Sequence, residues 1–444
     1  MKVKTHGRTG LRQFGGNIYE EFISDLRGAN GIEVFKEMEM DDTCGAILYA
    51  IDILCRQVDW IVNPAGDTED DKKAAQFINE CIYDMSDTWA NNISEILTFL
   101  IYGWSWLEIL YKRRNGNKGD FKSNYDDGLI GWAAWDIRSQ ETLQNWEFDE
   151  YDRVIGMTQN VDGVTYTIPR DKSLHFRTKS RKGNPEGVSI FRNAYKAFYF
   201  KKRIQELEGI GVERDLAGLP MITAPEGVDI WNAEDDNVTA YRIYAETLVR
   251  NVRRDATEGV VMPNGWEFKL LSSGGSRNFD TGAVIERYDK RIAMTVLADF
   301  MLLGQDGSGS YAMATNKSEI FMKSLKTYLD GIEDEINKQA IPKLIDLNKD
   351  HFIGITDYPT IDHGDLTTQS MQEVGTFLKD MVSSGVLTPD EGIEDFVRSI
   401  GKLPERPDAA FNETLVTVDG EDQTEVEVYK QIEKIFAEEG EADE

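Results

Sequence analysis

The chain has 444 residues, of which 41% are hydrophobic, so it is long enough for two or three domains and can bury real cores. This composition excludes general disorder. The formal net charge of −30 argues against a protein that wraps DNA on a basic surface, although it is compatible with one that surrounds DNA without binding it tightly.

An arm and three helices are predicted for the N-terminal quarter. Residues 1–40 are rich in glycine and charged side chains and are expected to form an arm. Apolar side chains recur at helical spacing within 41–62, 70–85 and 92–102, and Asn63-Pro64-Ala65-Gly66 is expected to end the first helix. The cysteines lie in these apolar patterns and form no C-x-x-C pair, so we expect buried, reduced thiols at Cys44, Cys55 and Cys81.

No membrane segment is predicted. The first seven residues contain no apolar run typical of a signal peptide. The most apolar stretch, 93–111, is interrupted by Glu95, Gly103 and Glu108. A buried helix followed by a strand explains it better than a membrane span.

A β-rich region follows. Residues 105–111 suit a strand, and Asn115-Gly116 and Asp127-Gly128 are turn signals. Residues 146–168 predict a hairpin that turns at Asp162-Gly163.

Helices dominate the next part of the chain. Gly187 is expected to open an aromatic-rich helix that ends near 216–220. A second helix is predicted for 238–254, a short hairpin for 259–271, and an amphipathic helix for 280–301.

A loop and a longer helix come next. Three glycines in 304–310 favour a loop, because they leave the backbone few constraints. Asn316, with Glu319 three residues on, is typical of a capping box that restarts a helix. That helix is expected to run to Pro342 with one apolar stripe, formed by Phe321, Leu325, Leu329, Ile332 and Ile336.

The C-terminal part predicts two short helices and an acidic tail. The helices are expected at 371–384 and 388–400. Residues 405–444 hold 14 acidic and 3 basic side chains, which is typical of a solvated tail. Within it, 426–436 is compatible with a short docking helix.

The sequence carries no recognisable catalytic motif. The glycine-rich loop lacks the G-K-[ST] ending of a phosphate-binding loop, and no H-E-x-x-H or G-x-S-x-G is present. With 79 acidic residues some close carboxylate pair is inevitable, so the carboxylates alone do not indicate a glycoside hydrolase. We therefore expect no enzyme activity, no cofactor and no metal. Four residues close in sequence are compatible with a cation site but more typical of a solvated turn: Asp357, Asp362, His363 and Asp365.

Residues 170–203 form a basic segment in an acidic chain. They contain 11 lysines and arginines but 2 acidic residues. One interpretation is a face that balances an acidic neighbour, within the subunit or across a subunit interface. The other is contact with nucleic acid or an acidic partner. The tightest part of the segment is the basic cluster of Arg177, Lys179, Arg181 and Lys182.

The order of the predicted elements resembles the portal proteins of tailed phages, of the phage Mu type. No single motif is diagnostic, and the resemblance lies in order and spacing over residues 45–350. It continues more weakly into Gly385–Pro389. The stretches that carry it are Asp52–Trp60 with Asn63–Ala65, Ala75–Ile78, Gly187–Phe191 with Gly218–Pro220, and Arg291–Ala298 with Asn337–Pro342.

The resemblance implies an α+β, mainly helical subunit of a portal-type ring, with wing, stem, clip and crown. The ring would be a homododecamer at one capsid vertex of the virion, assembled in the host cytoplasm. Double-stranded DNA would pass through its channel during packaging and ejection. The implied partners are the major capsid protein, the large terminase and the head-tail adaptor, with no membrane. Other classes are a different structural ring or adaptor of the virion and, less favoured, a hydrolase.

The resemblance also implies a division of the chain. After the arm come a wing (41–237), a first stem helix (238–254), a clip (255–274), a second stem helix (275–301), a tunnel loop (302–315), a long wing helix with its connector (316–360), a helical crown (361–404) and the acidic tail (405–444). The helix that begins at Gly187 is an alternative stem helix.

Candidate contact residues follow from this division. In the tunnel loop they are Gln305, Ser308, Ser310, Tyr311 and Met313. Cations that would line the stem channel are Arg287, Lys290 and Arg291, for which ordinary helical pairing with Glu286 and Asp289 is the alternative. In the clip, the docking residues would be Glu258, Asn264, Trp266 and Glu267.

Overall fold

The fold was analysed in a computed structural model of the chain. It describes residues 7–217, 219–231, 236–251, 261–262, 264–271, 280–302 and 311–366. The chain divides into two compact units, Met1–Thr367 and Thr368–Glu444. The second unit, with the predicted crown helices and acidic tail, lies outside the described residues.

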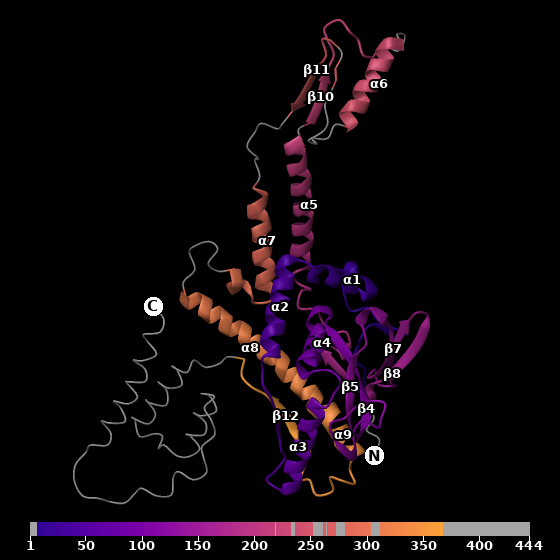
Figure 1. Cartoon of the computed structure of the whole chain (residues 1–444), viewed down its shortest axis with the longest axis vertical. Coiled ribbons are helices and arrows are strands. Elements are labelled where there is room, and N and C mark those ends of the chain that lie inside the picture. The colour runs from indigo at the N-terminus through magenta and orange to yellow at the C-terminus, as the bar shows by residue number, and fades with distance from the viewer. Residues whose placement is uncertain are drawn as a thin grey trace, which may run out of the picture. The chain divides into compact units, whose positions relative to one another are not determined.

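The first unit contains a body of helices packed on short antiparallel sheets (Figure 1). Before the helices come a small hairpin, β1 (Gln13–Phe14) with β2 (Asn17–Ile18), and a short 3-10 turn. Four helices follow: α1 (Gly28–Glu39), α2 (Asp42–Arg56), α3 (Glu69–Tyr83) and α4 (Trp89–Tyr102). The predicted arm at 1–40 is therefore replaced, from Gly28 on, by a helix whose Phe35 and Met38 are buried.

Local side chains cap three of these helices. The Asp41 carboxylate accepts from the backbone N–H groups of Thr43 and Cys44 at the start of α2, while Thr68 and Thr88 cap α3 and α4 in the same way. Each such cap satisfies backbone donors that have no partner within the helix. The three cysteines are free and buried, as predicted.

Two three-stranded antiparallel sheets form the β-rich part of the body. The first has the order β5 (Asp126–Ile137), β4 (Trp104–Asn115), β9 (Ser173–Arg177). The second has the order β6 (Leu143–Phe148), β7 (Val154–Val161), β8 (Val164–Pro169). The predicted turn is confirmed, because Asp162 and Gly163, with φ of 51° and 81°, turn β7 into β8. The first arm expected over 146–159 is instead divided between two paired strands, β6 and β7.

The main core joins segments that are far apart in sequence. The long helix α8 (Tyr311–Glu335) continues through a π-helical turn (Ile336–Ala340) into α9 (Ile341–Leu347). Its predicted apolar stripe is confirmed, since all five side chains are at most 1% exposed and belong to the same buried cluster as α2 and α4. Pro342 does not end the helical run. It falls in the first turn of α9, where a missing N–H costs little.

Several predicted boundaries are corrected by contacts distant in sequence. The first helix ends at Arg56, and Trp60–Asn63 forms β3, which pairs with β12 (Thr360–His363). Asn316 lies inside α8 with an exposed side chain, so the predicted capping box is wrong. The helix expected from Gly187 begins at Tyr195.

Three more helices and one more sheet follow the body. They are α5 (Tyr195–Ala217), α6 (Asp236–Asn251) and α7 (Thr281–Thr295), with β10 (Leu219–Thr223) pairing β11 (Glu267–Leu271). The hairpin predicted within 259–271 is therefore replaced by a strand pair that encloses α6 in sequence. Helix α7 ends early, and Leu297 turns the chain with a φ of 61° before a 3-10 turn at Asp299–Leu302. None of the helices within the described ranges is long and apolar enough to cross a lipid bilayer.

Candidate subunit-contact and channel surfaces

Helices α5 and α7 lie side by side and form a two-helix stalk (Figure 1). The Phe200 and Tyr288 rings stack with centroids 6.2 Å apart, and the Thr281 hydroxyl donates to the Glu208 carboxylate. The sequence division instead paired 238–254 with α7. In the structure α6 packs against β10, where Tyr241 lies 6.2 Å from the Trp266 ring. The stalk helix beside α7 is thus the one that follows Gly187.

A buried lysine joins this stalk to the body. The Lys201 side chain of α5 is fully buried, and its Nζ lies 2.8 Å from Asp41 Oδ2 and 2.6 Å from Asp289 Oδ1. It also donates to Asp42. Asp41 and Asp42 belong to the start of α2, while Asp289 belongs to α7. One ammonium group therefore holds three helices together, and we name this group of four residues the Lys201 clamp.

The charges of the Lys201 clamp stabilise one another. Burial lowers the pKa of Lys201, but the hydrogen bonds to Asp289, Asp41 and Asp42 outweigh it and raise the pKa above the ordinary value of lysine. The hydrogen bond from Lys201 is also the main reason why the pKa of Asp42 is lowered. Both shifts keep the charged forms in place at neutral pH. The sequence analysis missed this joint because its members are far apart in the chain.

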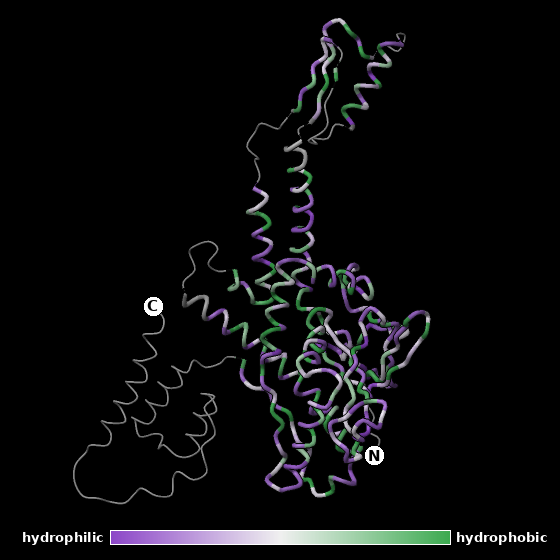
Figure 2. Tube along the Cα trace, in the orientation of Figure 1, coloured by the Kyte–Doolittle hydropathy of each residue, from purple (hydrophilic) through white to green (hydrophobic). Residues whose placement is uncertain are grey.

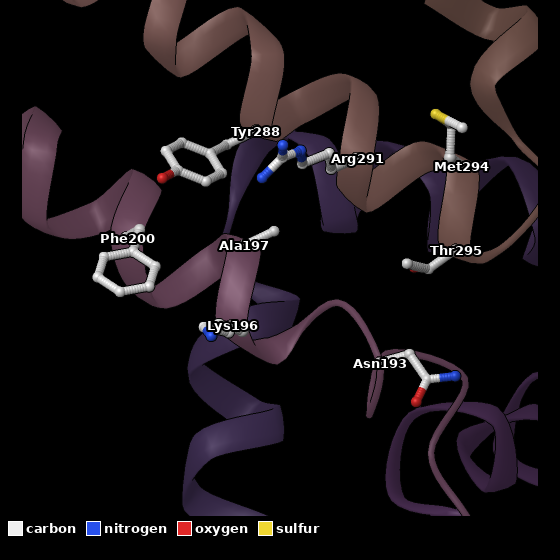
Figure 3. Close-up of a pocket in the computed structure, with 8 residues that line it drawn as sticks. All are labelled: Asn193, Lys196, Ala197, Phe200, Tyr288, Arg291, Met294 and Thr295. Atoms are coloured by element: carbon white, nitrogen blue, oxygen red, sulfur yellow. The ribbon is translucent and has the colours of Figure 1, made fainter.

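A cleft of about 500 Å³ opens between α5 and α7 at the base of the stalk (Figure 3). On the α7 side, Tyr288 and Arg291 face Ala197 and Phe200 of α5, and the Arg291 guanidinium lies 5.7 Å from the Tyr288 ring centre. Met294, near the end of the cleft, is 60% exposed. The full lining is Asn193, Lys196, Ala197, Phe200, Tyr288, Arg291, Met294 and Thr295.

Helix α5 also carries apolar side chains that remain largely exposed beside α7. Tyr199, Leu207 and Ile210 are 55%, 54% and 46% exposed. At about 100° per residue, these three side chains fall within roughly 80° of the helix circumference. Phe200, Lys201 and Glu208, which contact α7, point roughly 100–200° away from Tyr199. We name Tyr199, Leu207 and Ile210 the outer α5 stripe. Figure 2 shows apolar positions recurring along α5 among polar ones.

The three predicted channel cations lie on α7, two of them exposed. Lys290 Nζ lies 2.7 Å from Glu286 Oε1, which is the helical pairing that the sequence offered as the alternative. Arg287 and Arg291 are exposed, and both guanidinium groups lie over the Tyr288 ring, at 5.6 Å and 5.7 Å. Their role in a channel stays a prediction.

Most predicted tunnel-loop residues cannot be placed. Gln305, Ser308 and Ser310 lie outside the described residues. Tyr311 and Met313 belong to the first turn of α8, a part of the helix in which the backbone alone is described.

The predicted clip residues gather around β11. Asn264 and Glu267 are exposed, and Trp266 is half-buried beside Tyr241 of α6. The hydrogen bond from Lys269, at 2.5 Å, lowers the pKa of the Glu267 carboxyl. Glu258 lies outside the described residues.

Much of the basic segment is balanced within the chain. Lys182 bonds to Glu20 at 3.0 Å, and Arg192 bonds to Glu21 at 2.8 Å. Arg177 donates to Ser180 Oγ and to the Asn184 carbonyl, both at 3.0 Å, and burial lowers its pKa. These contacts favour the acidic-neighbour interpretation for most of the segment. Two members of the basic cluster are exposed and have no ion-pair partner among the described residues: Lys179 and Arg181.

An α+β body, a two-helix stalk with uncovered apolar side chains and a small β10–α6–β11 module define a structural subunit built for packing. A family profile described as the portal protein of Mu bacteriophage matches residues 32–398. The match covers most of the chain, and the chain belongs to this family of phage portal proteins. The family is one of structural proteins of the virion, not of enzymes.

Solved structures of low sequence identity were also compared. A chain from the neck of an empty gene transfer agent particle has a TM-score of 0.51 and 11% identity, with 87% of this chain and 95% of that chain covered. A chain from the virion of the native gene transfer agent particle has a TM-score of 0.49 and 11% identity, with 87% of this chain and 95% of that chain covered. An HK97 family phage portal protein from Corynebacterium diphtheriae has a TM-score of 0.38 and 10% identity, with 74% of this chain and 94% of that chain covered. The neck structure of the empty particle supports the same overall fold.

Proposed function

We propose that this chain is the subunit of a dodecameric portal ring at one capsid vertex of a tailed phage. Double-stranded DNA passes through the ring into the head during packaging and out of it during ejection. The family match over residues 32–398 carries this proposal. The similar neck structure of a gene transfer agent particle, computed with C6 symmetry, supports a ring assembly.

The packing of the helices supports a revised division of the chain. In it, α5 and α7 are the two stem helices, and β10, α6 and β11 form the clip. The wing consists of the body from α1 to β9, together with α8 and α9. The tunnel loop is shortened, because residues 311–315 belong to α8. The crown begins later than predicted, because β12 (Thr360–His363) pairs with β3 of the body and the first unit runs to Thr367. The remainder of the predicted crown and the acidic tail lie outside the described residues.

The outer α5 stripe supports self-association through the stem. An isolated two-helix stalk leaves these apolar side chains in water, and contiguous exposed apolar surface marks an interaction site. In a closed ring every stem has a neighbour on each side. The stripe of one copy would then pack on the α5–α7 cleft side of the next, which removes both surfaces from water.

Weak attraction to DNA suits such a channel. Duplex DNA carries one charge per roughly 1.7 Å, and every phosphate that a protein neutralises adds affinity. The chain is acidic overall, and of the three predicted channel cations Lys290 already bonds to Glu286. Arg287 would help to centre the duplex without holding it, whereas Arg291 lines the α5–α7 cleft, which the neighbouring stem would cover.

The partners follow from the same division. The clip would dock first the large terminase and later the head-tail adaptor, and the wing would contact the major capsid protein. Assembly would take place in the host cytoplasm, before the ring becomes part of the virion.

The ring itself is the first expected result. The purified full chain at micromolar concentration, imaged by electron microscopy over a range of salt concentrations, is expected to show closed rings with an axial hole. Mass photometry of the same samples should give about twelve subunits per particle. Monomers and dimers alone under every condition, or closed particles without a hole, contradict the proposal.

Deletion of residues 307–311 is expected to leave ring assembly intact and to impair packaging or retention of DNA. The reason is that the tunnel loop would contact DNA in the channel and would not lie between subunits. Ring formation is measured by microscopy, and packaged DNA by nuclease protection in an infection complemented with the variant. Normal DNA content in the complemented heads would show that the loop has no such role.

In the clip, Glu267→Lys is expected to weaken terminase binding about tenfold or more, because a charge in a docking surface is reversed. The exposed pair with Lys269 contributes little to folding, so ring formation should not change. Glu69→Lys, which breaks a similarly exposed pair with Lys72 on α3 of the body, is the control. Equal terminase affinity of wild type and Glu267→Lys in a binding titration argues against this docking residue.

A further inference from the structure

Three side chains that could hold a metal ion meet where α8 passes β12. Asp330 and Glu333 lie one turn apart on α8, and His363 is the last residue of β12. Pairing of β12 with β3 places His363 opposite Trp60, whose ring lies 5.7 Å from the imidazole. The sequence analysis noted His363 together with Asp357, Asp362 and Asp365, but the structure gives it a different set of neighbours.

The tautomer of His363 is determined by its surroundings. Nδ1 lies 2.9 Å from the carbonyl oxygen of Gly364. A carbonyl oxygen only accepts hydrogen bonds, so Nδ1 carries a proton and donates it. In the neutral imidazole, Nε2 therefore presents a lone pair. That lone pair points at Asp330 Oδ1, 3.0 Å away, and lies 3.8 Å from Glu333 Oε2.

A lone pair facing two carboxylates needs a positive charge between them. The His363 side chain is 3% exposed, and Glu333 and Asp330 are 28% and 56% exposed, so the imidazole is shielded from water while the carboxylates reach toward solvent. Two nearby lysines of the same helical run bond elsewhere: Lys326 to Asp365 at 3.4 Å and Lys338 to Asp334 at 3.1 Å. Either a proton on Nε2 or a bound cation fills this position.

We propose that Asp330, Glu333 and His363 form a binding site for a divalent transition-metal ion, of which Zn²⁺ is the suitable probe. The three donor atoms lie within 4.8 Å of one another. Donors about 2.1 Å from a shared ion are separated by roughly 3.0–3.4 Å, so small side-chain rotations bring all three into range. The Nδ1 bond to a backbone carbonyl is the outer-shell contact that orients histidine ligands of metals.

The donor set also indicates which metals would bind. Imidazole suits Zn²⁺ and neighbouring transition metals, whereas Ca²⁺ and Mg²⁺ prefer oxygen donors alone. With three protein ligands, a tetrahedral ion keeps one position for water. The bound ion would fix the end of β12 to α8, a few residues before the second unit of the chain begins at Thr368.

The test is a calorimetric titration of the full chain, freed of metal, with Zn²⁺ and separately with Mg²⁺. We expect one equivalent of Zn²⁺ to bind to the wild type with submicromolar affinity and Mg²⁺ to bind far more weakly. His363→Ala should weaken Zn²⁺ binding by more than about 100-fold, since it removes a direct ligand. His351→Ala is the matched control, because His351 is exposed and lies outside the cluster. It should bind Zn²⁺ as the wild type does.

A measurement on the wild type alone guards against misfolding of the variant. Co²⁺ added to the metal-free chain should produce visible absorption bands of a site with nitrogen and oxygen donors, and Zn²⁺ should abolish them. Three results would overturn the proposal. They are no stoichiometric Zn²⁺ binding by the wild type, equal losses in His363→Ala and His351→Ala, or Co²⁺ bands that persist with excess Zn²⁺.

Discussion

Lys201→Met is expected to lower the free energy of unfolding of the first unit by about 3–5 kcal/mol, because breaking a buried ion pair leaves uncompensated charge. The Lys201 side chain is fully buried, and two of its three partners, Asp41 and Asp289, are only 7% and 21% exposed. Without the ammonium, these carboxylates repel each other where little water reaches them. Unfolding in urea, followed by circular dichroism, measures the loss.

The neighbouring residue provides the control. Lys202 bonds to Glu37, but both side chains are nearly half exposed. Exposed pairs contribute about 0–1 kcal/mol, so Lys202→Met should change little. A combined Lys201→Met and Asp289→Leu variant should recover part of the loss, because replacing a buried pair by apolar side chains is often nearly neutral. If Lys201→Met and Lys202→Met lower the free energy of unfolding by the same amount, the Lys201 clamp does not hold the stalk.

The clamp matters for the proposed ring because of what it connects. It links the start of α2 in the body to both stalk helices, α5 and α7. A subunit without it would keep its helices but lose the fixed angle between stem and wing. Ring closure depends on that angle, since each copy must meet its neighbour by the same rotation. The single substitution is thus expected to reduce the yield of closed rings as well as stability.

Local patterns were enough to predict many individual elements. The stripe from Phe321 to Ile336 repeats at helical spacing, and burial follows the spacing directly. The Asp162-Gly163 turn is similarly local, because both residues accept positive φ. Family membership was predicted too, since the order of elements survives where the sequence identity to solved structures is near 11%.

Pairings between distant segments were not predictable in this way. Residues 60–62 continue an apolar helical pattern, yet they form β3 because β12, some 300 residues later, supplies a partner strand. Likewise, α5 and α6 are both long enough to accompany α7. What selects α5 is the contact of Lys201 with Asp289 and of Phe200 with Tyr288. Neither contact leaves a spacing pattern in the sequence.

The candidate site divides along the same line. Arg287 and Glu267 could be named from the sequence as exposed charges, and their roles in a channel and a docking surface stay predictions. The Lys201 clamp, the outer α5 stripe and the meeting of His363 with Asp330 were missed, since each depends on which face of an element another element covers. The fold class can therefore be predicted from the composition and the order of the elements. The contact surfaces depend on how the elements pack, which the sequence pattern does not reveal.

Leu207→Asp is expected to prevent ring assembly while leaving the monomer folded. Leu207 is 54% exposed in the isolated subunit, so the substitution costs the monomer at most about 1 kcal/mol. In the ring, the same position would be covered by a neighbouring stem. A carboxylate buried there without a partner costs several kcal/mol, which should weaken subunit association by about 100-fold or more.

Leu347→Asp is the matched control, because Leu347 is a helical leucine of similar exposure, 48%, at the end of α9 and far from the stem in sequence. Both variants should unfold within a few degrees of the wild type. Mass photometry should then find rings for wild type and Leu347→Asp, and monomers for Leu207→Asp. Rings of normal size from Leu207→Asp would place the outer α5 stripe outside the interface. Loss of rings in both variants would mean that any added charge disrupts assembly. The proposed stem interface is therefore tested by the difference in ring assembly between variants of two leucines with nearly equal exposure.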